Sequence, residues 1–189
     1  MTIKTFNINT DKTAFVRAYL PDSIAGLSFC EKRPAVLIFP GGGYEYCSDR
    51  EGEPIALQYL ALGYAAFVVT YSCNERFPEP LMDAAYIFYK IRMRAEEFKI
   101  DPQKMAVLGC SAGGHLAGCL ATMWSDIALT KTIGCEPEDL RPNAAILCYP
   151  VISGVTAPHE GSFKVLLGED ASRSDLSRLS LENRVTPKT

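Results

Sequence analysis

The sequence lacks any dense block of Lys and Arg. Of its 189 residues, 19 are Lys or Arg and 22 are Asp or Glu, so its formal net charge is −3. A nucleic-acid-binding surface needs the opposite balance. No apolar run approaches the roughly 20 residues that cross a bilayer, and the polar segment 1–13 has no apolar stretch of the kind found in signal peptides. We therefore expect neither a nucleic-acid partner nor a membrane partner.

The cysteines also lack a pattern. There are seven, an odd number, and they are scattered without a C-x-x-C pair. This arrangement favours neither a disulfide framework nor a zinc site, and free thiols are typical of the reducing cytoplasm. We expect a cytoplasmic protein without a metal or an organic cofactor. Its length suits one domain, 1–189, and is too short for two domains of ordinary size.

Short apolar runs alternate with helical stretches along most of the chain. An early strand is expected at 13–20, and buried strands at 35–39, 64–71, 104–109 and 143–150. Helices are expected at 54–62, from Pro80 and from Ala112. This order predicts an α/β fold with a mostly parallel sheet and helices on both faces. Residues 151–189 are rich in Gly, Ser and Asp, so we expect loop or lid material there.

Gly109-Cys110-Ser111-Ala112-Gly113 matches the G-x-S-x-G nucleophile elbow. It lies between an expected strand and an expected helix, as an elbow requires. The turn would lift the Ser111 hydroxyl above the sheet at a helix N-terminus, where backbone N–H groups favour a developing oxyanion. We predict that Ser111 is the nucleophile. The alternative is a glycine-rich turn without chemistry.

Pro40-Gly41-Gly42-Gly43-Tyr44 follows the strand expected at 35–39. Hydrolases with a nucleophile elbow place their second oxyanion donor on such a loop. We expect N–H donors from Gly42 or Gly43, together with Ala112. A plain turn is the alternative. A phosphate loop does not fit, because neither G-x-G-x-x-G nor G-K-[ST] is present.

The runs FPGGGY, DREGEP, GCSAGGHLAG and RPNAAILCYPVIS, in this order, resemble the bacterial acetyl-esterase and xylan-esterase-like branch of the α/β hydrolases. That branch is related to the hormone-sensitive-lipase-like carboxylesterases. The resemblance implies the α/β-hydrolase fold and hydrolysis of small carboxylic esters, often acetyl groups on sugars. The expected partner is therefore a small-molecule ester.

Only two histidines are available to activate Ser111. His115 lies one helical turn after it and therefore beneath it, and the resemblance implies a packing role. His159 with Asp126 or Asp139 would formally complete a triad. Otherwise His159 contacts the substrate or is an inert surface residue. Tyr44 either lines the pocket or packs.

The resemblance implies that the triad Asp and His follow later strands, beyond Thr189. On this interpretation the chain is an N-terminal part that lacks C-terminal strands and helices, and we expect it to have almost no activity alone. The expected chemistry is two-step acyl transfer through an acyl-serine. The alternatives are a peptidase or lipase of the same fold, or a hydrolase-like remnant that binds without turnover.

Overall fold

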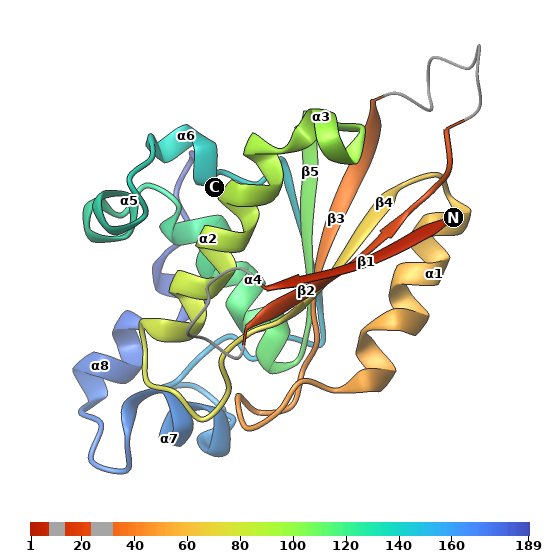
Figure 1. Cartoon of the computed structure of the whole chain (residues 1–189). Coiled ribbons are helices and arrows are strands. Elements are labelled where there is room, and N and C mark those ends of the chain that lie inside the picture. Colours follow the sequence, from red (N-terminus) through yellow and green to blue (C-terminus); the bar gives the residue numbers. More distant parts are fainter. Residues whose placement is uncertain (8–13, 24–31) are drawn as a thin grey trace.

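The computed structural model describes residues 1–7, 14–23 and 32–189. These residues form a six-stranded sheet with the order β1-β2-β4-β3-β5-β6 (Figure 1). The strands β3 to β6 pair in parallel, whereas β2 pairs antiparallel with β1 and β4. Thr13, at which we expect the first strand to begin, lies outside the described residues. The bounds are β1 (Thr2–Asn7), β2 (Phe15–Leu20), β3 (Arg33–Phe39), β4 (Ala65–Thr70), β5 (Ile100–Cys110) and β6 (Ala144–Cys148).

Three apolar runs of the sequence become β3, β4 and β5, which are covered on both faces. The strand expected to be buried at 143–150 is β6, and the side chains of β6 are exposed or half-buried because it lies at the edge of the sheet. In β3, Leu37 and Phe39 belong to the larger of two cores, and Val36 and Ile38 belong to the smaller core on the opposite face. This alternation follows from the two-residue period of a strand. Figure 1 shows α1 (Glu53–Ala61) on one side of the sheet, with α2 (Glu79–Met93) and α4 (Ala112–Met123) on the opposite side.

Shorter helices complete the described chain. Two of them lie in residues 151–189, where the sequence led us to expect loop or lid material. The last 3₁₀ turn packs on α4 so closely that a Cβ atom at Gly118 would lie 2.4 Å from Leu181 Cδ1. This segment therefore contains two short helices between loops, and its last turn is docked on α4. The elements are α3 (Ala95–Phe98), α5 (Ile127–Ile133), α6 (Pro137–Leu140), α7 (Glu160–Leu167), α8 (Arg173–Arg178) and 3₁₀ turns at Asp49–Glu51 and Leu181–Asn183.

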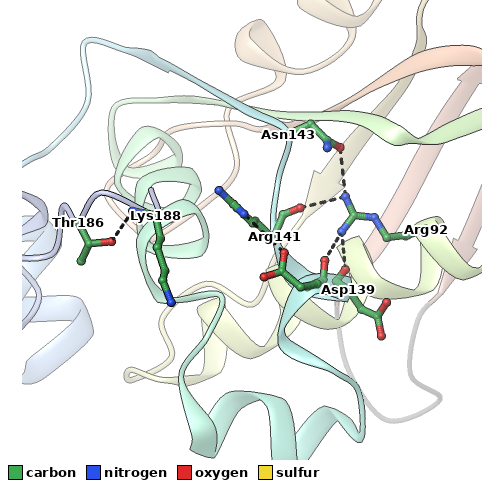
Figure 2. Close-up of polar contacts among 7 residues, drawn as sticks. Arg92, Asp139, Arg141, Asn143, Thr186 and Lys188 are labelled. Carbon is green, nitrogen blue, oxygen red and sulfur yellow. Dashed lines mark hydrogen bonds and ion pairs between the residues drawn. The ribbon is translucent and has the colours of Figure 1, made fainter.

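Arg92 of α2 fixes the segment that leads into β6. Its guanidinium group donates to Asn143 Oδ1 and, at 2.8 to 3.1 Å, to four backbone carbonyls. Figure 2 shows the hydrogen bonds from Arg92 to Asn143, Arg141 and Asp139. The same Asn143 oxygen accepts the N–H of Met105 in β5. Arg92 thus ties a helix to two strands. The four carbonyls belong to Pro102, Glu138, Asp139 and Arg141.

Within 1–7, 14–23 and 32–189, no helix combines the length and the hydrophobicity that crossing a bilayer would require.

Candidate active site

Ser111 lies on the sharp turn between β5 and α4. Its φ is +51° and its ψ is −118°, a backbone conformation that non-glycine residues rarely adopt. Hydrogen bonds on both sides hold it there. The Ser111 N–H donates to Cys148 O at 3.0 Å, and the Ser111 carbonyl accepts the N–H groups of His115 and Val151 at 3.0 and 3.1 Å. Strain that is fixed by its surroundings in this way is typical of functional sites.

Two glycines flank Ser111 because the backbone passes too close for a side chain. A Cβ atom at Gly109 would lie 2.0 Å from Gly113 O. A Cβ atom at Gly113 would lie 2.0 Å from Phe39 O, at the end of β3. Both distances are far below van der Waals contact. The elbow therefore brings α4 directly onto the end of β3.

This packing places the triple-glycine loop beside the serine. The position of a Cβ atom at Gly41 is only 3.0 Å from Ser111 Cβ. The Gly41 N–H is already occupied by a carboxylate. The N–H groups of Gly42, Gly43 and Ala112 make no hydrogen bond to any residue in the described ranges. They are therefore available for a ligand, and their role as an oxyanion hole stays a prediction.

The carboxylate of Glu51 connects the glycine loop to the end of β6. Its Oε2 accepts the Gly41 N–H at 2.6 Å, and its Oε1 accepts the Tyr149 hydroxyl at 2.7 Å. This bond to Glu51 raises the pKa of Tyr149. Neither residue is predicted as part of the site from the sequence. Glu51 belongs to the DREGEP run, but no local pattern identifies partners that lie 10 and 98 residues away.

Ser111 opens into a cavity of about 630 Å³. Its lining includes Tyr149, Thr156, His159 and Glu182, which follow β6 in the sequence. The site therefore combines the elbow with polar side chains from the C-terminal segment. A cavity of this size suits a small molecule.

His159 shares this cavity with Ser111, but its ring is already engaged. Its Nδ1 accepts the Ser162 N–H at 3.3 Å and caps α7. With Nδ1 as the acceptor, Nε2 is the nitrogen that carries the proton of the neutral ring and can donate it in a hydrogen bond to a ligand. Asp126 and Asp139 accept backbone N–H groups of their own helices, and in the described part of the chain neither bonds to His159. The triad alternative is not assembled in this structure.

His115 and Tyr44 lie in the core, where each is 1% exposed. The His115 Nε2 is 2.8 Å from Leu179 O, and its Nδ1 is 2.7 Å from the Tyr44 hydroxyl. Because a carbonyl oxygen only accepts, Nε2 carries the proton and Nδ1 accepts from Tyr44. The position of His115 fits the expected packing role. Tyr44 is directed into the core and away from the cavity, so its position does not support the expected contact with a substrate.

Burial lowers the pKa of His115 from its usual value of about 6.5. Below that pH the unfolded chain takes up a proton that the folded chain excludes. Stability is therefore present above pH 6.5 and is lost as the pH falls. We expect His115 to contribute a slope of up to about 1.4 kcal/mol per pH unit below pH 6.5. Urea unfolding at pH 5.5, 6.5 and 7.5 measures it, and His115→Gln should have a smaller slope. Equal slopes in the two proteins would contradict the prediction.

The sequence is similar to one family model and to curated proteins. The family model described as BD-FAE matches residues 26–157. Endo-1,4-beta-xylanase B of Butyrivibrio fibrisolvens is 35% identical over 165 residues, which is 84% of this chain and 26% of that protein. Acetylxylan esterase of Xylanibacter ruminicola is 30% identical over 190 residues, which is 96% of this chain and 35% of that protein.

Solved structures show the same relationship. The crystal structure of an acetyl ester-xyloside bifunctional hydrolase from Caldicellulosiruptor lactoaceticus is 34% identical with a TM-score of 0.81, and the match covers 97% of this chain and 66% of that one. An alpha/beta hydrolase enzyme from a Medee basin deep-sea metagenome library is 45% identical with a TM-score of 0.70, over 80% of this chain and 58% of that one. This chain therefore spans about a quarter to a third of the two curated relatives and less than two thirds of the structural ones.

Proposed function

Because the chain belongs to the BD-FAE family and has the α/β-hydrolase fold, we propose that it carries the nucleophile and the oxyanion hole of a carboxylic ester hydrolase. The observation that carries the proposal is the position of Ser111. It lies on a strained elbow beside three backbone N–H groups that have no acceptor within the described ranges. Such preorganised donors stabilise charge that develops in an acyl-transfer transition state.

The proposed reaction has two steps. The Ser111 Oγ attacks the ester carbonyl carbon, and the oxyanion is held by the N–H groups of Gly42, Gly43 and Ala112. The alcohol leaves, and water then releases the acid from the acyl-serine. His115 is buried with both ring nitrogens hydrogen-bonded, and the His159 Nδ1 caps α7. We therefore propose that the general base is a residue outside these 189.

The proposed substrate is an acetylated sugar. The names of three relatives refer to xylan or xyloside chemistry, and two of them to acetyl esters or acetylxylan. The cavity supports this assignment, because Thr156, Glu182 and the His159 Nε2–H offer hydrogen-bonding groups to sugar hydroxyls.

A substrate panel tests this proposal. The protein expressed from its complete reading frame should release acetate from acetylated xylo-oligosaccharides faster than it cleaves long-chain p-nitrophenyl esters or peptide amides. Preference for either of the other two classes would contradict the substrate. Failure both to turn over any ester and to label with a fluorophosphonate would favour a binding remnant.

His159 provides a second arm of the same panel. Asn is a good helix N-cap, so His159→Asn keeps the cap of α7 and removes the Nε2–H donor from the cavity. We expect the KM for acetylated oligosaccharides to rise by about tenfold, the effect of one lost hydrogen bond, with little change for p-nitrophenyl acetate. An unchanged KM would exclude a contact between His159 and the sugar.

Glu51 is proposed to position the glycine loop. Glu51→Ala removes the acceptor of the Gly41 N–H, and we expect kcat to fall by roughly 10- to 100-fold while KM changes little. Glu51→Gln should recover most of kcat, because its amide oxygen can accept from Gly41 and its NH₂ group can donate to Tyr149. Initial rates over a range of ester concentrations separate kcat from KM.

Tyr149→Phe is the matched control for Glu51. It removes one partner of Glu51 and leaves the bond to Gly41 in place. We expect kcat to stay within about threefold of the original value, the effect of one exposed hydrogen bond. If Tyr149→Phe lowers kcat as much as Glu51→Ala does, the hydrogen bond between Glu51 and Gly41 is not the cause of the loss.

A further inference from the structure

We propose that Cys47 and Cys73 form a thiol pair that closes to a reversible disulfide. Their Sγ atoms are 3.8 Å apart, and both side chains are partly exposed. Cys47 follows the glycine loop after β3, and Cys73 follows β4. Because β3 and β4 are parallel neighbours, the two loops leave the sheet at the same edge. Nothing in the proposed esterase function uses either thiol.

Hydrogen bonds already hold the two loops together. Asn74 donates its backbone N–H to Tyr44 O at 2.7 Å and its side-chain amide to Glu45 O at 2.8 Å. The Tyr71 hydroxyl donates to Pro40 O at 2.7 Å. These hydrogen bonds hold the loop that carries Cys47 against the loop that carries Cys73. A disulfide needs a sulfur separation of about 2.05 Å, so the two atoms must approach by less than 2 Å.

The two thiols differ in reactivity. The hydrogen bond with Cys47 lowers the pKa of Cys73, and the bond with Cys73 raises the pKa of Cys47. The thiolate is the nucleophile in disulfide exchange. Cys73 is therefore the attacking residue, and Cys47 is the residue that completes the bond.

The oxidant is a low-molecular-weight disulfide such as glutathione disulfide. The Cys73 thiolate attacks one of its sulfurs, the sulfur–sulfur bond breaks, and one glutathione thiolate leaves. Capping removes the negative charge of Cys73, so Cys47 can then lose its proton to solvent. The Cys47 thiolate attacks Cys73 Sγ and releases the second glutathione thiolate. Two thiols of the protein are oxidised and one glutathione disulfide is reduced to two thiols.

A second pair of cysteines serves as an internal comparison. Cys110 and Cys148 are directly paired residues on the neighbouring strands β5 and β6. Cys110 is 2% exposed, and burial raises its pKa to about 11. Only a small fraction of the Cys110 side chains is therefore ionised at neutral pH. We expect the Cys110–Cys148 pair to stay reduced under conditions that oxidise Cys47 and Cys73.

The experiment equilibrates the folded protein with graded ratios of oxidised to reduced glutathione. Remaining thiols are then blocked, and peptides are mapped by mass spectrometry. We expect a Cys47–Cys73 linkage that disappears after addition of dithiothreitol. Cys135→Ser should leave it unchanged, because Cys135 is a free cysteine that takes no part in the contact between Cys47 and Cys73. Absence of the linkage at every ratio, or a Cys110–Cys148 linkage that forms more readily, would overturn the proposal.

Two variants separate the roles of the thiols. Cys47→Ser keeps a hydroxyl that can donate to Cys73 but removes the second thiol, so Cys73 should accumulate as a mixed disulfide with glutathione. Cys73→Ser should leave Cys47 unmodified under the same conditions. The reverse pattern, or no glutathione on Cys73 in Cys47→Ser, would contradict the assignment. These measurements do not depend on esterase activity, so their failure leaves the proposed function untouched.

Discussion

Ser111→Ala is expected to reduce ester hydrolysis by the protein expressed from its complete reading frame by about 10⁴- to 10⁶-fold. The range is the one found when the nucleophile of a serine hydrolase is removed. Alanine fits the elbow sterically but has no hydroxyl to attack the carbonyl. Only the oxyanion donors and substrate binding would remain. The initial rate of p-nitrophenyl acetate hydrolysis, measured with enough enzyme to detect the residual activity, gives the value.

Cys110→Ala is the matched control for Ser111, because it changes the preceding residue of the same turn. Cys110 belongs to the small core on the face of the sheet opposite α4. We expect it to retain activity within about tenfold, with a loss of stability of the size found for a small cavity. Retention of more than about 1% activity by Ser111→Ala would show that Ser111 is not the nucleophile. Loss of fluorophosphonate labelling in Ser111→Ala provides an independent readout.

Gly113→Ala is expected to destabilise the fold by about 3 kcal/mol or more, at the upper end of overpacking effects. The added Cβ would lie 2.0 Å from Phe39 O and 2.4 Å from Pro40 O. Both are backbone atoms, which cannot rotate away, so α4 must separate from the end of β3. For a chain of this size the melting temperature should fall by roughly 6 to 12 °C. Thermal unfolding followed by circular dichroism measures the change.

Gly161→Ala is a suitable control for this substitution. Gly161 lies in α7, and a Cβ atom there would meet only the His159 ring, at 3.6 Å, an ordinary contact. Helical Gly-to-Ala replacement at an unstrained position should be neutral or stabilise by up to about 1 kcal/mol. If both variants melt at the same temperature, the close approach of Gly113 to β3 does not limit stability.

Much of the fold could be predicted from sequence because its central strands are buried on both faces. Such strands require continuous apolar runs, and β3, β4 and β5 have them. Boundaries were harder to predict. β5 begins at Ile100 and not at Lys104, because Ile100 pairs with Arg33 across an irregular register that leaves no trace in the apolar pattern.

The helices of the C-terminal segment were missed for a different reason. α7 and α8 have 8 and 6 residues, too few to be stable without tertiary contacts. Phe163 of α7 is buried against the ring of His115, which is far away in sequence, whereas α8 has no buried residue. The Ser172–Asp175 capping box is the local feature that indicates the start of α8. Ser and Asp are also common in loops, so the residues of this box do not distinguish a helix from a loop.

In the site, the features that follow from local sequence were found and the long-range ones were not. The elbow needs only a strand, a glycine-flanked serine and a helix. Parallel neighbours end at the same sheet edge, so the glycine loop after β3 had to lie near Ser111 after β5. The direction of Tyr44 depends on its φ of +66°, which a tyrosine does not reveal in sequence. The bridge from Glu51 to Tyr149 joins residues that topology alone does not pair.

The hydrogen bonds of Arg92 have an evolutionary consequence. Four of its five acceptors are main-chain carbonyls, which every amino acid provides. Substitutions at 138, 139 and 141 can therefore accumulate without disturbing this anchor, provided that the path of the backbone is kept. Asn143 has no such freedom, because its side-chain oxygen accepts from both Arg92 and Met105. We expect homologues to vary widely across the first three positions while retaining the arginine and the asparagine together.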